Sequence, residues 1–257
     1  MTLRIGLAIL LLGKSLLATD FDRILIPVFA SVAQPGAFGS LWATELVIRN
    51  QSAEPIPLIP PLCDPRFPPR FCFTPSILHP YSTDRVAGFG GISSGPLMLN
   101  VPPGSGDRIL ASLRVIDLSR TAEQYGTSIP VVRERDLRTG SVQILDVPNS
   151  DGLRSSLRVF DFDSRDESSF EVRAYALDTD ELLSAMTFHT FGVPPGRPPG
   201  VEITQPGYFN LPVADFVAPA TNRKLRIEVT GLDGVRFWAF VSVTANQTQF
   251  VTVLLPQ

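Results

Sequence analysis

The stretch KLRIEVTGLDGVRFWAFVSVT, residues 224–244, contains two segments in which apolar and polar side chains alternate. Such a period of two is typical of half-buried β-strands, and the GLDG between the segments is typical of a turn. The stretch therefore predicts two strands separated by a turn. The residues expected on the apolar face are Leu225, Ile227 and Val229 in the first strand, and Phe237, Ala239, Val241 and Val243 in the second.

The same alternation recurs along the chain after residue 20. It is present in ELVIR (residues 45–49) and in FEVRAYAL (residues 170–177), and polar turn sequences such as RNQSAE and LDTDE separate the segments. The chain also contains 24 prolines and 19 glycines, which a helical bundle tolerates poorly because each interior proline costs about 3 kcal/mol. The sequence therefore predicts an all-β fold.

Two blocks of the chain resemble each other. GSLWATELVIRNQSAEPIPL begins at Gly39 and DGLRSSLRVFDFDSRDESSFEV begins at Asp151, and ASLRVIDLS (residues 111–119) likewise resembles AFVSVTANQ (residues 239–247). An internal duplication would give two consecutive antiparallel β-sandwich (immunoglobulin-like) units, 21–135 and 141–257, with a proline-rich, cysteine-containing insertion at 55–80 in the first. One larger sandwich or barrel is the alternative. The matched positions are Leu46 with Leu157, Ile48 with Val159, and Asn50 with Asp161.

The N-terminal residues MTLRIGLAILLLGKSLLATD indicate a secretory signal peptide over residues 1–18. Arg4 precedes an apolar run, and Ala18 is a small residue suited to cleavage. The run is shorter than the ~20 apolar residues that span a bilayer. An N-terminal strand or anchor is the alternative. We expect a secreted, periplasmic or cell-surface protein with no stable membrane span after signal removal.

A resemblance rests on ILIPVFASVAQPGAFGSLWATELVIRN, residues 24–50, and on RIEVTGLDGVRFWAFVSVTANQT, residues 226–248. The first is similar to the opening of a class of uncharacterised exported bacterial β-sandwich proteins, with the pattern Ile-Pro-Val, then Trp-x-Thr-x-Leu-x-x-x-Asn. The second resembles their closing hairpin. The resemblance implies a β-sandwich fold and supplies no catalytic residue.

The chain has two cysteines, Cys63 and Cys72, in PPLCDPRFPPRFCF, residues 60–73. In an exported protein a disulfide is the default expectation, and closing so short a loop contributes roughly 2–3 kcal/mol. The spacing matches neither a zinc site nor a Cys-x-x-Cys redox pair. A stiffened loop could also recognise a ligand. Its candidate contact residues are Arg66, Phe67, Arg70 and Phe71.

The acidic run DFDSRDE is a weak calcium candidate, because its oxygens lie on a turn. It lacks the glycine and the distal glutamate of an EF-hand loop, so a solvated turn is the simpler interpretation. His79 and His189 are the two histidines, and no Gly-x-Ser-x-Gly motif accompanies them. We therefore expect no catalytic residue, no cofactor and no metal site. The calcium candidates are Asp161, Asp163, Asp166 and Glu167.

A net charge of −3 argues against a nucleic-acid-binding face. The sequence therefore predicts an exported, non-enzymatic protein with a binding, adhesive or envelope-structural role, whose ligand would be a protein or a glycan. Two alternatives remain open. One is a carbohydrate-active enzyme or its carbohydrate-binding accessory domain, and the other is a calcium-dependent adhesion module.

Overall fold

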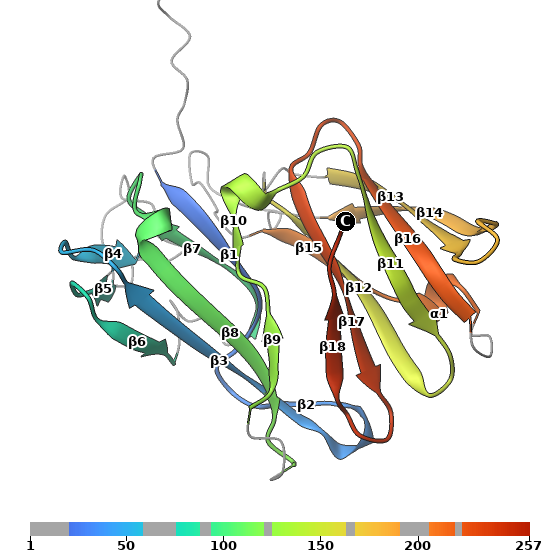
Figure 1. Ribbon diagram of the computed structural model, residues 1–257, viewed down its shortest axis with the longest axis horizontal. Coiled ribbons are helices and arrows are strands. Elements are labelled where there is room, and N and C mark those ends of the chain that lie inside the picture. Colours follow the sequence, from blue (N-terminus) through green and yellow to red (C-terminus); the bar gives the residue numbers. More distant parts are fainter. Residues whose placement is uncertain are drawn as a thin grey trace, which may run out of the picture.

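The computed structural model describes residues 21–58, 76–87, 94–120, 125–162, 168–190, 206–218 and 223–257. They form an all-β structure of antiparallel sheets, as the alternating patterns predict (Figure 1). One four-residue α-helix, α1 (Val213–Phe216), occurs among the described residues. We call the strands β1 to β10 the first half and the strands β11 to β18 the second half.

The first half contains a three-stranded sheet, β10-β1-β7, a sheet in the order β2-β3-β8-β9 with β6 also paired to β3, and the separate pair β4-β5. Three short 3-10 helices lie between its strands or after them. The elements are β1 (Asp22–Ala30), β2 (Gln34–Pro35), η1 (Ala37–Gly39), β3 (Leu41–Asn50), β4 (Ile56–Leu58), β5 (Ser76–Leu78), β6 (Thr83–Val86), β7 (Ser94–Val101), η2 (Gly106–Arg108), β8 (Ile109–Asp117), β9 (Thr127–Ile129), β10 (Val132–Arg133) and η3 (Glu134–Asp136).

The second half contains two four-stranded sheets, β11-β16-β13-β14 and β15-β12-β17-β18. The strands are β11 (Ser141–Asn149), β12 (Leu153–Asp161), β13 (Ser168–Ala176), β14 (Leu182–Thr190), β15 (Gly207–Pro212), β16 (Arg223–Gly231), β17 (Phe237–Ala245) and β18 (Val251–Leu254).

The strand pairing of the two halves follows the same order. In the first half β3 pairs with β6 and β8, and β8 pairs with β9; in the second half β12 pairs with β15 and β17, and β17 pairs with β18. The opening strands also correspond, because β1 pairs with β7 and β11 pairs with β16. Both opening strands are interrupted by a register shift, between Ile26 and Phe29 in β1 and between Ile144 and Val147 in β11.

The closing hairpin that the resemblance implies over residues 226–248 is wrong in its pairing. Both strands form where the alternation predicts them, but β16 pairs with β11 and β13, whereas β17 pairs with β12 and β18. The connection therefore crosses from one sheet to the other. The physical reason is that the apolar faces of both strands can be buried in either arrangement. Here the two strands lie in facing sheets, and both faces contribute to the core between those sheets.

Each half has its own buried core. In the second half the inward residues of β13 and β16 pack with those of β12 and β17, as the alternation predicts. The ends of the predicted insertion at 55–80 belong to the core of the first half, because Ile56, Leu58 and Leu78 of β4 and β5 are buried in it. Three aromatic residues of the second half also lie in this first core, namely Phe160, Phe162 and Phe240.

The junction between the halves is held by polar contacts as well. Glu134 in η3 forms ion pairs with Arg23 of β1 and with Arg236, which precedes β17. Arg138 pairs with Phe237 through the backbone. At the far side, strands β9 and β18 lie side by side, and the Thr127 hydroxyl donates to the Val251 carbonyl at 2.8 Å (Figure 1).

Candidate functional site

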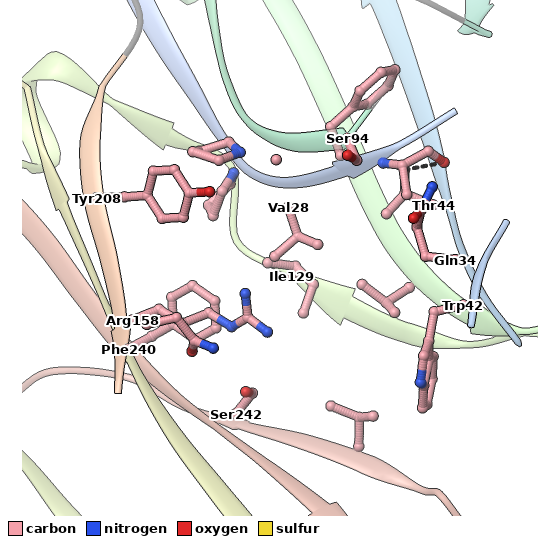
Figure 2. A pocket seen from close by; sticks show the side chains of 18 of the residues that line it. Val28, Gln34, Trp42, Thr44, Ser94, Ile129, Arg158, Tyr208, Phe240 and Ser242 are labelled. Atoms are coloured by element: carbon pink, nitrogen blue, oxygen red, sulfur yellow. Dashed lines mark hydrogen bonds between the residues drawn. The ribbon is translucent and has the colours of Figure 1, made fainter. Parts of the chain in front are cut away.

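A cleft of about 470 Å³ lies between the two halves. This volume falls in the range of sites that hold small ligands. One side is the outer face of the sheet β15-β12-β17, which we call the floor. The opposite wall comes from β1, β3, β8 and β9 of the first half (Figure 2). The cleft therefore exists only where both halves meet.

The period of a strand determines which residues form the floor. In β12, Leu157 and Val159 point into the second core, so Arg158 and its neighbours two residues away point outward. The antiparallel register then sets Arg158 between Asn210 of β15 and Phe240 of β17. The outward residues of these three strands thus lie in rows across the sheet.

The outward side chains of the floor change from apolar to polar along the strands. At one end Phe160 stacks on Phe240, with 6.0 Å between the ring centroids, and both rings are buried by the first half. Further along β12 and β17 the outward residues are Arg158, Ser242 and Arg154, and here the cleft opens. The apolar end of the floor joins the halves, and the polar end remains accessible.

The opposite wall is mostly apolar at its centre. Val28 and Ile129 face the guanidinium of Arg158 across the cleft (Figure 2). Thr44 of β3 is fixed by Ala30 of β1, because its hydroxyl accepts from the Ala30 backbone N–H at 2.8 Å and donates to the Ala30 carbonyl at 3.2 Å. A ligand would therefore meet an apolar surface on this side.

Trp42 lies at one end of the wall, and the backbone at Gly36 packs closely against its indole ring. A Cβ atom added to Gly36 would lie 2.4 Å from Trp42 Nε1 and 2.3 Å from Ser40 Oγ, well inside van der Waals contact. The φ angle of Gly36 is −118°, an ordinary value. Gly36 is therefore required by space and not by backbone conformation, and it lets the loop lie against the indole ring.

Arg158 is the central charged residue of the floor. Its Nε is buried without a hydrogen-bond partner, and the described residues that line the cleft include no Asp, Glu or His. Burial lowers the pKa of Arg158, and the neighbouring Tyr208 offsets this only in part. A guanidinium nevertheless keeps its proton in proteins. Arg158 therefore places in the cleft a positive charge that none of the described lining residues balances.

Arg154 lies two rows further out on the same face of β12. It donates to the side-chain oxygen of Gln249 at 2.7 Å, and its guanidinium lies 4.9 Å from the ring centroid of Phe38 in η1. Its Nη1 is buried without a partner. Because Phe38 belongs to the first half, this cation–π contact links the two halves near the outer end of the cleft.

A second hollow of about 520 Å³ adjoins the cleft and shares Arg154, Arg158 and Ser242 with it. Asp151 is the acidic residue among its described lining residues. The two arginines thus lie at the border of both spaces. A ligand longer than the cleft could continue past Arg154 along the same sheet face.

The structure locates few of the residues singled out from the sequence. Cys63, Cys72, Arg66, Phe67, Arg70 and Phe71 lie outside the described residues, so the disulfide and the recognition loop stay predictions. Asp163, Asp166, Glu167 and residues 1–18 lie outside them as well.

Asp161, the remaining calcium candidate, is fully buried at the end of β12. Its Oδ2 accepts the hydroxyl of Ser168 at 2.5 Å, so this carboxylate ties β12 to β13. His79 and His189 are both exposed, and Ser169 Oγ lies 3.1 Å from His189 Nδ1. No group of three or more His, Cys, Asp or Glu within the described ranges is arranged to hold a metal ion.

The sequence reasoning missed the cleft arginines. In LRSSLRVF, residues 153–160, both arginines occupy the polar phase of a regular strand, which is the ordinary pattern of a solvated sheet face. Phe160 and Phe240 were the available signal of a covered face. Each is a large apolar residue at a position where the alternation of its strand would place a polar, outward side chain. Such a residue indicates that something covers the face.

Comparisons of this chain with protein-family models, with curated proteins and with solved structures found no match. Among the described residues, no helix has the length and apolar character needed to cross a membrane.

Proposed function

We propose that this chain is an exported, non-enzymatic protein of two immunoglobulin-like β-sandwich units, and that it binds a ligand in the cleft between them. The signal-like residues 1–18 support export to a secreted, periplasmic or cell-surface location. The ligand is a glycan or part of a protein, and the role is in binding, adhesion or the cell envelope.

The corresponding strand pairing of the halves supports an origin by internal duplication. The matched positions Leu46 and Leu157 both lie in the central strand pair of their half and are buried. Asn50 and Asp161 are both fully buried polar residues at the ends of β3 and β12. A duplicated unit explains why a buried polar group recurs at the same place.

The observation that carries the binding proposal is the exposed, polar part of an otherwise buried junction. A junction selected only for stability would continue the packing of Phe160 and Phe240 across the whole sheet face. Here it gives way to a cleft of ligand size, and the Nε of Arg158 in its floor has no hydrogen-bond partner. Binding sites commonly combine apolar walls with a few polar groups in this way.

Glycan-array and pull-down screens of the mature protein, followed by titration calorimetry, test the proposal. Ser242→Trp would fill the cleft, because Ser242 lies in its floor. Ser112→Trp is the matched control, since Ser112 is exposed on β8 and does not line the cleft. We expect Ser242→Trp to abolish binding and Ser112→Trp to preserve it. Equal binding by both variants, or turnover lost on substituting one carboxylate, would refute the proposal.

A carbohydrate-binding accessory domain is the second candidate. The half-exposed ring of Tyr208 and the indole of Trp42 flank the cleft, and aromatic rings with one polar end suit sugar surfaces. A glycosidase needs two carboxyl groups about 5–10 Å apart at the scissile bond, and no carboxyl group is among the described residues lining this cleft. Assays with polysaccharides would distinguish the two, because an accessory domain binds them without releasing reducing ends.

A further inference from the structure

The charge balance inside the cleft identifies the chemical class of ligand. Arg158 presents a cation whose Nε has no hydrogen-bond partner, and Arg154 presents a second buried nitrogen without one. No carboxylate of the described lining residues neutralises either charge inside the cleft. Buried polar groups in native proteins are rarely left unsatisfied, so an orphaned one calls for a partner that is not part of the chain.

The shape of a guanidinium further limits which chemical group can be that partner. Arginine presents N–H donors in a planar fork that matches the two oxygens of a carboxylate. Figure 2 shows the Arg158 side chain extending from the floor into the cleft, toward Val28 and Ile129. A carboxylate between these surfaces would accept from Arg158 while its carbon skeleton contacts the apolar wall.

The neighbours of Arg158 indicate what the carboxylate is attached to. Asn210 lies beside it on β15, and Ser242 lies diagonally across on β17, so an amide and a hydroxyl flank the charge. Tyr208, half exposed, adds a ring face at the same end. Hydroxyl-bonding groups beside a ring and a cation suit a sugar that carries a carboxylate.

We propose that the cleft binds an acidic oligosaccharide, with the carboxylate of a uronic acid unit held by the guanidinium of Arg158. This inference rests on the proposed binding function and specifies its ligand. Arg154, on the same face of β12 and four residues away, is placed about 13 Å from Arg158 by the rise of a strand. It would meet a second acidic unit further along the chain.

The test compares two probes of equal shape and different charge. These are a linear trigalacturonate and its fully methyl-esterified form, with inorganic phosphate as a third probe for a bare anion. We expect the acid to bind about 10- to 100-fold more tightly than the ester, as one charge-assisted hydrogen-bond pair allows. Added salt should narrow this difference. Stronger binding of phosphate than of the acid would contradict the proposal.

Arg158→Gln should remove the preference for the acid, and Arg158→Lys should keep part of it, because lysine retains the charge without the fork. Arg49→Gln is the control, since Arg49 is exposed on β3, away from the cleft. The melting temperature of Arg158→Gln should match or exceed that of the parent, because a desolvated cation is removed. This measurement shows that a loss of binding is not a loss of folding.

The outcomes separate the inference from the function on which it rests. If acid and ester bind equally and Ser242→Trp blocks both, the cleft binds a ligand but the assignment of an acidic one is wrong. If neither probe binds, the inference is overturned, while the array and pull-down screens still decide whether the cleft binds something else.

Discussion

Buried polar residues mark the ends of the central strands. The Asn50 side-chain amide donates to the Glu54 and Leu78 carbonyls, at 2.6 Å and 3.1 Å, and so ties β3 to the β4-β5 pair. Asp161 ties β12 to β13 through Ser168. These hydrogen bonds satisfy buried polar groups, and each such group left without a partner would lower the free energy of unfolding by about 1–3 kcal/mol. The sequence predicted that positions 50 and 161 correspond, but it did not predict which hydrogen bonds their side chains form.

Asp117, at the end of β8, gives the fold a dependence on pH. Burial alone would raise the pKa of this carboxyl, but the N–H groups of Leu41 and Ser119, the Ser119 hydroxyl and the charge of Arg120 outweigh burial and lower it below its ordinary value of 3.8. A lowered pKa in the folded state stabilises the fold above the ordinary value. That contribution disappears as the pH falls through the lowered one.

Asp117→Asn should therefore lower the free energy of unfolding by about 1–2 kcal/mol near pH 7. Near pH 3, below the ordinary carboxyl pKa of 3.8, the difference from the parent should shrink, because the unfolded parent takes up a proton on this carboxyl more readily than the folded parent does. Urea unfolding at the two pH values measures both. Asp84→Asn, on the exposed edge strand β6, is the control. An equal deficit at both pH values would contradict the role given to the charge.

At the scale of the element, strand positions could be predicted and strand partners could not. The alternation in residues 170–176 and 224–244 identifies the inward side chains, and the structure buries them as expected. Pairing depends on which sheet buries a given face, and the period of two is the same for a hairpin and for a crossing between sheets. The expected hairpin of β16 and β17 was wrong for this reason.

The loop between β2 and β3 offers a test of close packing at one element. Gly36→Ala places a methyl group 2.4 Å from Trp42 Nε1 and should lower the free energy of unfolding by about 1–3 kcal/mol. Tryptophan fluorescence should shift as the indole is displaced. Gly152→Ala is the matched control, because its Cβ would meet nothing within 4 Å. Equal stability of the two variants would show that the loop yields without cost.

At the scale of the whole molecule, the two halves are joined because aromatic residues of the second half lie in the core of the first. Phe240 belongs to a strand of the second half, yet it is fully buried with residues of the first. The sequence predicted two units, and Phe240 in the polar phase of its strand indicates that something covers that face, but the pattern does not say which distant segment does so. The cleft follows from the contact, so it could not be predicted either.

Phe240→Ala should lower the free energy of unfolding by about 3–5 kcal/mol, as expected for a large cavity in a core. Because the ring joins the halves, amide exchange should increase in both β1 of the first half and β17 of the second. Phe250→Ala, whose ring is 57% exposed, should change stability by less than about 0.5 kcal/mol. Faster exchange confined to the second half would contradict the role given to Phe240 in joining the halves.

The cleft has walls from both halves, so occupancy and docking are linked equilibria. A ligand that binds only the docked arrangement raises the free energy of separating the halves by about 2.7 kcal/mol at a hundred times its dissociation constant. The ligand would then act as a removable part of the junction, in the place where Arg158 and Ser242 interrupt the packing of Phe160 and Phe240. Resistance of this protein to mechanical or proteolytic separation of its halves would rise and fall with the ligand concentration.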